Sequence, residues 1–195
     1  MIRHSSTQLE SLIAIAASVA GAHRLEDVLE VAADRARDAM GVATLSISRW
    51  DIERGCLRTL INSGGGGDLW PDDEIYPLDE FPAAVALLRA GRPHLAFIGN
   101  PATDAAEQRL LAELGMDCSA AVPIVFEGVT WGELYAASGS DRPPLSESDV
   151  HYMQAICGQI GLALGRAELF SRLSALAFED ALTGREPAPA RARGR

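Results

Sequence analysis

The sequence predicts an α+β domain in which an antiparallel sheet carries helices on its faces. Its 195 residues are 48% hydrophobic, which is enough for one domain with a proper core. Segments with helical periodicity and segments with strand periodicity follow one another along the chain. Two apolar arms, 118–126 and 129–137, flank Glu127-Gly128 and predict a central β-hairpin whose two faces are both covered.

The first part of the chain predicts two helices and two strands. Apolar residues recur at helical spacing over 7–20 and over 25–40, and Gly41 suits the C-cap of the second helix. Residues 43–50 alternate between two faces. The apolar face holds Ala43, Leu45 and Ile47, and the other holds Thr44, Ser46, Ser48 and Trp50. A turn over 51–55 leads to a returning strand over 56–62.

The middle of the chain predicts short elements joined by loops. The glycine run 64–67 lacks the Gly-Lys-Ser/Thr that a phosphate loop needs, so it indicates a flexible loop. After it we expect a short extended piece over 74–78, a helix over 81–90, a strand over 94–98 and a helix over 105–114. Asp104 is the expected N-cap of that last helix.

The hairpin and the final helix complete the pattern. Gly128 suits a type I turn closed by a glycine bulge, and Pro123 requires an edge, a bulge or an outward N–H position. Ser146 and Asp149 form a capping box for a helix over 147–181. That helix has two apolar stripes, and the second would be a large exposed patch. We therefore expect a homodimer formed by residues 7–20 and 150–181.

The hairpin also carries a family resemblance. Ala-Val-Pro-Ile at 121–124, Gly128 and Trp-Gly-Glu-Leu at 131–134 resemble the closing hairpin of a GAF domain. The order of elements over 7–170 is similar to that of the family as well. The resemblance implies terminal helices on one face of the sheet and a ligand pocket on the other, under the middle helices and loops. It implies a regulatory small-molecule sensor that signals through its terminal helices.

A second resemblance lies at the end of the chain. Residues 177–184 are similar to the start of a GGDEF diguanylate cyclase domain, with Asp180, Leu182, Thr183 and Gly184 matching its Asp-x-Leu-Thr-Gly signature. The match ends at Arg185, and the catalytic Gly-Gly-Asp/Glu-Glu-Phe loop is absent, so we expect no enzyme activity. The resemblance implies relatives that control cyclic di-GMP. The chain is then a truncated relative or a free-standing sensor.

These expectations divide the chain into three parts. Residues 1–170 are the sensor domain, 171–184 are a signalling helix with the GGDEF-start remnant, and 185–195 are a disordered tail. The net charge of −10 argues against binding to nucleic acid or to an anionic membrane. A cytoplasmic location is expected from the absence of an 18-residue apolar run and of a signal peptide.

The candidate ligand-binding residues come from the polar face of the first strand, the large aromatic side chains and the segments expected near the pocket. They are Ser46, Ser48, Trp50, Trp70, Tyr76, Phe81, Val85, His94, Phe97, Cys118, Trp131 and Tyr135. Hydroxyl groups below and aromatic rings above suit a small, flat, partly polar molecule, which the sequence does not identify.

Each candidate also has a plainer interpretation. Any one of the aromatic residues is as readily a core residue. Some GAF domains bind haem or carry a tetrapyrrole on a cysteine, but here a surface or strand-end His94 and a core Cys118 are favoured. The acidic residues 72–74 and 79–80 indicate a solvated loop, and the four histidines share no metal-ligand spacing.

Two alternative functions remain open at this point. One is a ligand-free dimerisation module. The other is an enzyme of the GAF subgroup that reduces methionine sulfoxide, for which the cysteines at 56, 118 and 157 are too dispersed.

Overall fold

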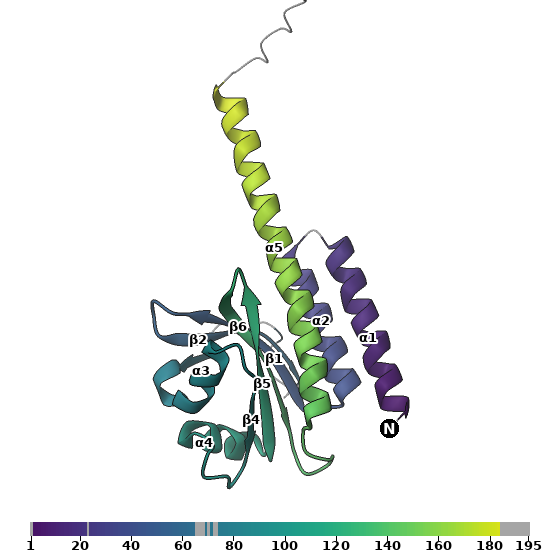
Figure 1. The fold of residues 1–195 in the computed structure, drawn as a ribbon, viewed down its shortest axis with the longest axis vertical. Coiled ribbons are helices and arrows are strands. Elements are labelled where there is room, and N and C mark those ends of the chain that lie inside the picture. Colours follow the sequence, from purple (N-terminus) through teal and green to yellow (C-terminus); the bar gives the residue numbers. More distant parts are fainter. Residues whose placement is uncertain (1, 23, 65–68, 70, 72–73, 184–195) are drawn as a thin grey trace, which may run out of the picture.

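The computed structural model describes residues 2–22, 24–64, 69, 71 and 74–183, and the surroundings of the side chains between 6 and 174 within these ranges. The elements follow the predicted order (Figure 1). They are α1 (Ile2–Gly21), α2 (Leu25–Met40), β1 (Thr44–Asp51), β2 (Cys56–Gly64), β3 (Ile75–Pro77), η1 (Leu78–Glu80), α3 (Pro82–Arg89), β4 (His94–Phe97), α4 (Ala105–Leu114), β5 (Cys118–Phe126), β6 (Val129–Ser138) and α5 (Glu147–Thr183).

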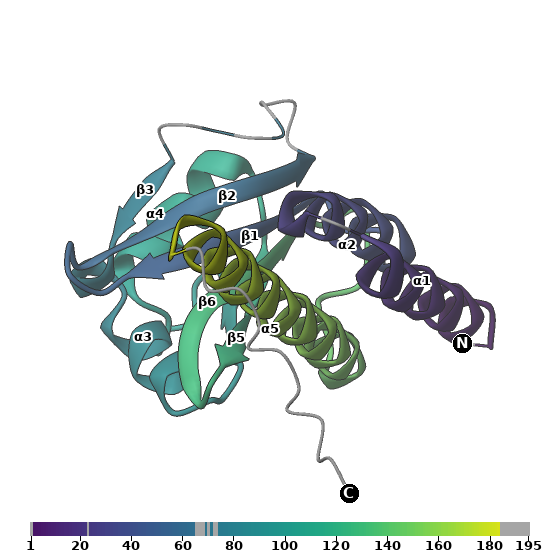
Figure 2. The same cartoon turned by 90° about the horizontal axis from the view of Figure 1, so that it is seen from above.

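The six strands form one antiparallel sheet in the order β3-β2-β1-β6-β5-β4. The helices α2 and α5 pack on one face of the sheet, with α1 beside them, and α3 and α4 lie on the opposite side (Figures 1 and 2). The α+β prediction with terminal helices on one face is therefore confirmed. Among the described residues, no helix combines the length and the apolar character that a membrane crossing requires.

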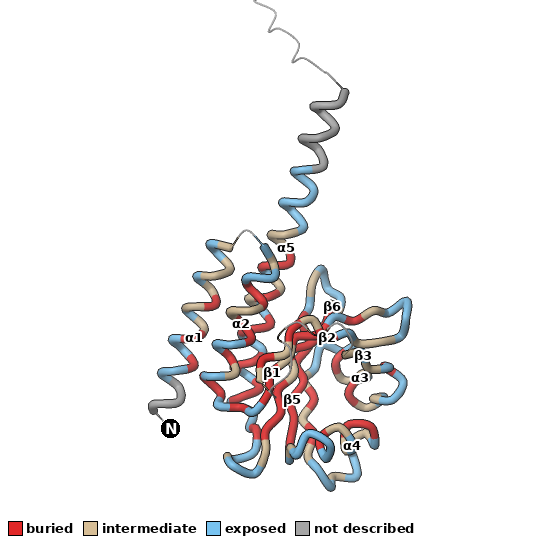
Figure 3. Tube along the Cα trace, turned by 180° about the vertical axis from the view of Figure 1, so that it is seen from behind, coloured by how far each residue is buried: buried red, intermediate tan, exposed pale blue. Residues whose placement is uncertain are grey.

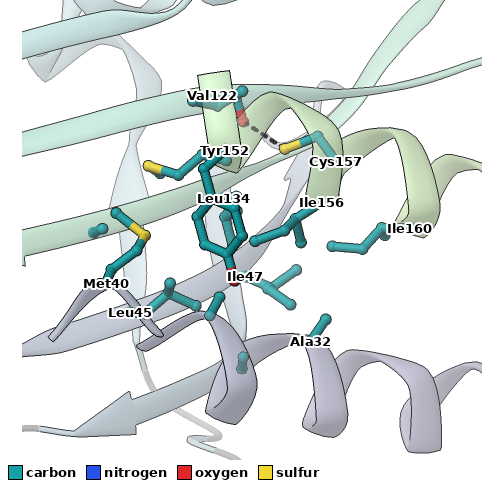
Figure 4. Packing of buried hydrophobic residues seen from close by; sticks show 14 of the residues in the cluster. Ala32, Met40, Leu45, Ile47, Val122, Leu134, Tyr152, Ile156, Cys157 and Ile160 are labelled. Carbon is teal, nitrogen blue, oxygen red and sulfur yellow. Dashed lines mark hydrogen bonds between the residues drawn. The ribbon is translucent and has the colours of Figure 1, made fainter. Parts of the chain in front are cut away.

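The main core lies between the sheet and the helices α2 and α5. Leu45 and Ile47 of β1 meet Ala32 of α2 and Ile156 of α5 in one buried cluster (Figure 4). The alternation predicted for β1 is thus correct, because its other face turns away from this cluster. The buried residues gather along the sheet and the inner sides of these helices (Figure 3).

Helix α1 is held to α5 by polar contacts as well as by packing. The Tyr152 hydroxyl of α5 donates a hydrogen bond to Ser11 Oγ of α1 over 2.7 Å, and Arg166 Nη1 donates to the Val19 carbonyl over 2.7 Å. Ile15 of α1 is fully buried in the main core. The first helix is therefore joined to the last one along part of its length.

The central hairpin has a tighter turn than expected. Phe126 pairs with Val129, so the loop has two residues, and both Glu127 (φ 50°) and Gly128 (φ 79°) take left-handed conformations. This is the pattern of a type I′ turn, which matches the strand twist, and not of a type I turn with a glycine bulge. The bulge lies instead between Ile124 and Val125.

Pro123 occupies a position that tolerates a missing N–H group. It pairs with Glu133 on β6, while the pairing of β5 with β4 extends only to Ala121. At Pro123 the strand therefore has a ladder on one side only, which satisfies the predicted edge requirement.

Helix α5 begins with the predicted capping box and extends well past the sheet (Figure 1). The Ser146 N–H donates to Asp149 Oδ2 over 2.9 Å, and the Asp149 N–H donates to Ser146 Oγ over 3.4 Å. Residues 177–183 continue this helix. The disorder predicted for 185–195 falls outside the described residues.

Candidate functional site

A cavity of about 290 Å³ lies on the sheet face opposite the terminal helices. Its floor comes from β1, β2, β5 and β6, and its walls from β3, η1, α3 and α4. The side chains that line it include Thr44, Ser46, Ser48, Trp50, Leu57, Thr59, Asn62, Glu74, Tyr76, Leu78, Phe81, Ala84, Val85, Leu88, Glu107, Leu110, Leu114, Met116, Ala121, Glu133 and Tyr135.

Hydroxyl and amide groups make up one part of the floor. Thr44 Oγ1 donates to Asn62 Oδ1 over 2.9 Å, and Asn62 Nδ2 donates to Glu74 Oε1 over 3.1 Å. Ser48 Oγ lies 3.4 Å from Thr59 Oγ1 on the neighbouring strand. Ser48 and Thr59 face each other across β1 and β2, whereas Thr44 and Asn62 are diagonal neighbours, because Thr44 faces Gly64. The Glu74 contact brings the segment before β3 to the same polar end of the cavity.

Two buried carboxyl groups line another part of the cavity, one from the floor and one from the wall. Glu107 on α4 is 3% exposed, and Glu133 on β6 is 7% exposed. His94 Nε2 lies 3.0 Å from Glu107 Oε2, and the Ser119 hydroxyl donates to Glu107 Oε1 over 2.5 Å. Glu107 therefore has two polar partners behind the cavity, whereas no hydrogen bond of normal geometry joins Glu133 to another described side chain.

The environment shifts the protonation of this cluster. Burial raises the pKa of Glu133 to about 7; the charge of Glu107 raises it further, while Trp50 and His94 offset part of the rise. For His94, burial lowers the pKa, but the hydrogen bond and charge of Glu107 outweigh it and the net pKa is raised. Burial also raises the pKa of Tyr135. Near neutral pH, Glu133 is consequently poised between its neutral and charged forms.

Aromatic side chains close the cavity on the remaining sides. Tyr76 and Phe81 pack edge to face with their ring centres 6.4 Å apart. The Trp50 side chain is buried, and its indole N–H makes no hydrogen bond of normal geometry. The buried hydroxyl of Tyr135 also makes no hydrogen bond of normal geometry, although Ser119 is close enough to offset part of the rise in the Tyr135 pKa.

A carboxylate from α4 fixes the helix that covers the cavity. Asp104 was predicted to cap its own helix, but its side chain makes no such bond. It accepts instead from the N–H groups of Ala83 and Ala84, over 3.0 and 3.1 Å, at the start of α3. The unpaired N–H groups and the dipole of α3 favour an anion at this place. The start of α3 is thereby held next to the start of α4.

The structure brings seven of the twelve candidate residues together around the cavity. They are Ser46, Ser48, Trp50, Tyr76, Phe81, Val85 and Tyr135. His94 lies on the same face but behind Glu107. It stands at the end of a strand, as the first residue of β4, but it is buried and not at the surface. Trp70 lies outside the described residues.

Three candidates lie on the opposite face of the sheet, against the helical core. Phe97 and Cys118 are cross-strand partners, so they share the face of Leu95 and turn away from the face of His94. Trp131 is the extra residue of a bulge on β6, because Ile124 pairs with Gly132 and Val125 with Thr130. The bulge changes the alternation, and the Trp131 ring packs with the helical core, with Arg49 over it.

Sequence reasoning missed the two carboxyl groups, although each carries a signal. Glu133 interrupts an otherwise apolar hairpin arm at a position that alternates with Tyr135. Glu107 lies on the stripe of Leu110, Leu111 and Leu114, at helical spacings of three, four and seven. A charged residue within an apolar pattern indicates a buried polar site. Of the acidic loop residues, Glu74 lines the cavity, whereas Glu80 is exposed and pairs with Arg109.

The cysteines take no part in the cavity. Cys56, Cys118 and Cys157 are all described, and none of them lines it. Burial raises the pKa of the Cys157 thiol, which lies 3.7 Å from the Val122 carbonyl. In the described part of the chain, no three His, Cys, Asp or Glu side chains gather in an arrangement that could hold a metal ion.

Comparisons with known proteins agree with this geometry. The phycoerythrobilin-bound GAF domain of a cyanobacterial phytochrome is 20% identical, with a TM-score of 0.70 over 84% of this chain and 97% of that one. The GAF domain of a phosphoenolpyruvate-protein phosphotransferase from Acinetobacter is 19% identical, with a TM-score of 0.64 over 83% and 95%. Its counterpart from Coxiella burnetii is 16% identical, with a TM-score of 0.69 over 86% and 98%.

At these identities the likeness to solved structures shows the fold. A comparison with curated protein sequences gives no match. The model of the GAF domain family, however, matches residues 24–164, which is most of the chain. The chain therefore belongs to the GAF domain family, whose members are regulatory modules of the sensor type.

Proposed function

We propose that the chain is a sensor that binds a small molecule in the cavity and passes the change to its terminal helices. The observation that supports this is the cavity of about 290 Å³, with polar groups on the floor and aromatic groups on the walls. Ligand sites combine these properties: a concave, largely apolar space and a few converging polar groups.

Strand β6 connects the cavity directly to the core under α5. On β6, Glu133 and Tyr135 line the cavity, while Leu134 between them packs in the core with Ile156 of α5. A ligand that displaces β6 therefore changes the packing of α5. Gly161 allows α5 to approach β5 closely, because a Cβ atom there would lie 2.9 Å from the Val125 carbonyl oxygen. Two packed arrangements of this contact would suffice to transmit binding.

We propose that the output lies in the control of cyclic di-GMP and that the chain itself is not an enzyme. The support is that residues 177–184, at the C-terminal end of α5, resemble the start of a GGDEF domain. The small molecule is then an input, and α5 is the segment through which an attached or associated output domain would be regulated.

We further propose a homodimer formed through α1 and α5. Leu9 and Ile13 of α1 and Leu162, Leu169 and Leu173 of α5 are each 59–64% exposed. Exposed leucines that recur at helical spacing on a helix extending past its domain suit a parallel pairing with a second copy.

A thermal-shift screen of the full chain against soluble metabolites tests the sensor proposal. We expect at least one compound to raise the melting temperature of the wild type and to lose this effect in Phe81→Ala, which removes an aromatic wall of the cavity. Ile52→Ala removes an exposed apolar side chain away from the cavity and serves as the matched control. If no compound shifts the melting temperature, the ligand-free dimerisation module becomes the better account.

A further inference from the structure

The charges around the cavity all have one sign. Among the described residues, the charged side chains that line it are Glu74, Glu107 and Glu133, and none of the lining residues is basic. Arg89 lies over the Trp50 ring, 5.9 Å from its centre, but it is exposed and does not line the cavity. A phosphate or carboxylate ligand would therefore enter without a cationic partner and face buried carboxylates, which is unfavourable.

The three carboxyl groups differ in how far their hydrogen-bonding capacity is already used. Glu74 accepts two contacts from Asn62, and Glu107 is held by His94 and Ser119. Glu133 is only 7% exposed, and no hydrogen bond of normal geometry joins its carboxyl group to another described side chain. Beside it, the buried indole N–H of Trp50 is close enough to offset part of the rise in the Glu133 pKa but makes no hydrogen bond of normal geometry. A buried charge and a buried donor that both face a cavity are groups that a ligand can satisfy.

We propose that the cavity binds a planar organic cation of the amidine or guanidine type, with its N–H edge on the Glu133 carboxylate and its flat face among Trp50, Tyr76 and Phe81. This inference rests on the proposed sensor function and names the chemical class of its ligand. Two adjacent N–H donors fit a carboxylate in parallel hydrogen bonds, and aromatic faces attract a delocalised cation.

Binding of such a cation depends on pH in a defined direction. Glu133 faces Trp50 of β1, Tyr135 of β6, Glu107 of α4 and His94 of β4. The ligand requires the charged form of Glu133, whose pKa is about 7, so affinity rises about tenfold between pH 6 and pH 8. Against the lowering effect of burial, the hydrogen bond to Glu107 holds the His94 pKa above its usual value. Loss of the His94 proton at higher pH makes the cluster more negative, which acts in the same direction.

Three probes of one shape test the proposal by charge: benzamidine as the cation, benzamide as the neutral isostere and benzoate as the anion. Each is titrated at millimolar concentration into the ¹⁵N-labelled full chain, and the indole N–H signal of Trp50 reports binding in the cavity. We expect benzamidine to bind at least tenfold more tightly than benzamide and benzoate to leave the signal unchanged. Glu133→Gln should remove the preference and most of the pH dependence, and Glu80→Gln, outside the cavity, should keep both.

Two results would overturn the proposal. One is benzamide or benzoate binding as well as benzamidine, and the other is no movement of the Trp50 signal with benzamidine at any pH from 6 to 8. Hits confined to anionic compounds in the metabolite screen would also refute the cation assignment while leaving the sensor proposal intact. A screen without any hit would remove the sensor proposal and this inference together.

Discussion

Replacement of Glu133 by glutamine should stabilise the empty protein, and more so at high pH. The pKa of this carboxyl is raised from its ordinary value of 4.5 to about 7 because the folded chain buries it beside Glu107. Below pH 4.5 it is protonated in both the folded and the unfolded states, so it does not lower the free energy of unfolding. As the pH rises from 4.5 to about 7, the unfolded state releases the proton while the folded state keeps it, and stability is lost until the folded carboxyl has also ionised.

The size of the effect follows from the two pKa values. Each pKa unit corresponds to about 1.4 kcal/mol, so ionisation of Glu133 lowers the free energy of unfolding by about 1 kcal/mol at pH 5 and about 3 kcal/mol at pH 8. Glutamine has nearly the same shape and does not ionise. Glu133→Gln should therefore be about 2 kcal/mol more stabilising at pH 8 than at pH 5.

Urea denaturation followed by circular dichroism at both pH values measures this difference. The other titrating groups are shared by wild type and variant, so the comparison of the two pH values reports on Glu133 together with its coupling to Glu107 and His94. Glu53→Gln, an exposed glutamate in the turn between β1 and β2, is the matched control and should change little at either pH. An equal effect of Glu133→Gln at pH 5 and pH 8 would show that the carboxyl is not held in its neutral form by burial.

Three further predictions concern the helices and the output. Gly161→Ala should lower the melting temperature, because the new Cβ atom would meet the Val125 carbonyl oxygen at 2.9 Å. Gly158→Ala is the control: a Cβ atom there would have no atom within 4 Å, so stability should rise by up to about 1 kcal/mol. The reverse order would contradict the close approach of α5 to β5. Light scattering at micromolar concentration should give a dimer, and Leu169→Glu should shift it toward monomer; a wild-type monomer would refute the α1–α5 interface. Incubation with GTP and Mg²⁺ should yield no cyclic di-GMP, and its formation would show that the chain holds cyclase activity of its own.

The sequence was most informative where one periodicity decided the structure. On β1, strict alternation separated Leu45 and Ile47 from Ser46, Ser48 and Trp50, and the structure places these two sets on opposite faces. The order and type of the elements were likewise predictable, since helices and strands of this length carry clear patterns.

The candidate site was less predictable, because side-chain direction in a strand depends on bulges that no local pattern marks. Trp131 is itself the extra residue of the bulge on β6, so it packs with the helical core while Glu133 and Tyr135 line the cavity. On β4, both faces are partly buried, so no alternation of apolar and polar residues places His94 and Phe97 on different sides. The pairing of His94 with Glu107 joins residues of two elements and becomes visible only in three dimensions.

Signalling by this domain requires that a molecule bound in the cavity changes the environment of α5. A titration of the ¹⁵N-labelled chain with a hit from the metabolite screen tests this directly, with the Trp50 indole N–H reporting on the cavity and the Gly161 amide on the contact of α5 with β5. We expect both signals to move with the same saturation curve. If the Trp50 signal saturates while the Gly161 amide and its neighbours on α5 stay where they were, the cavity binds a ligand but does not signal through the terminal helix.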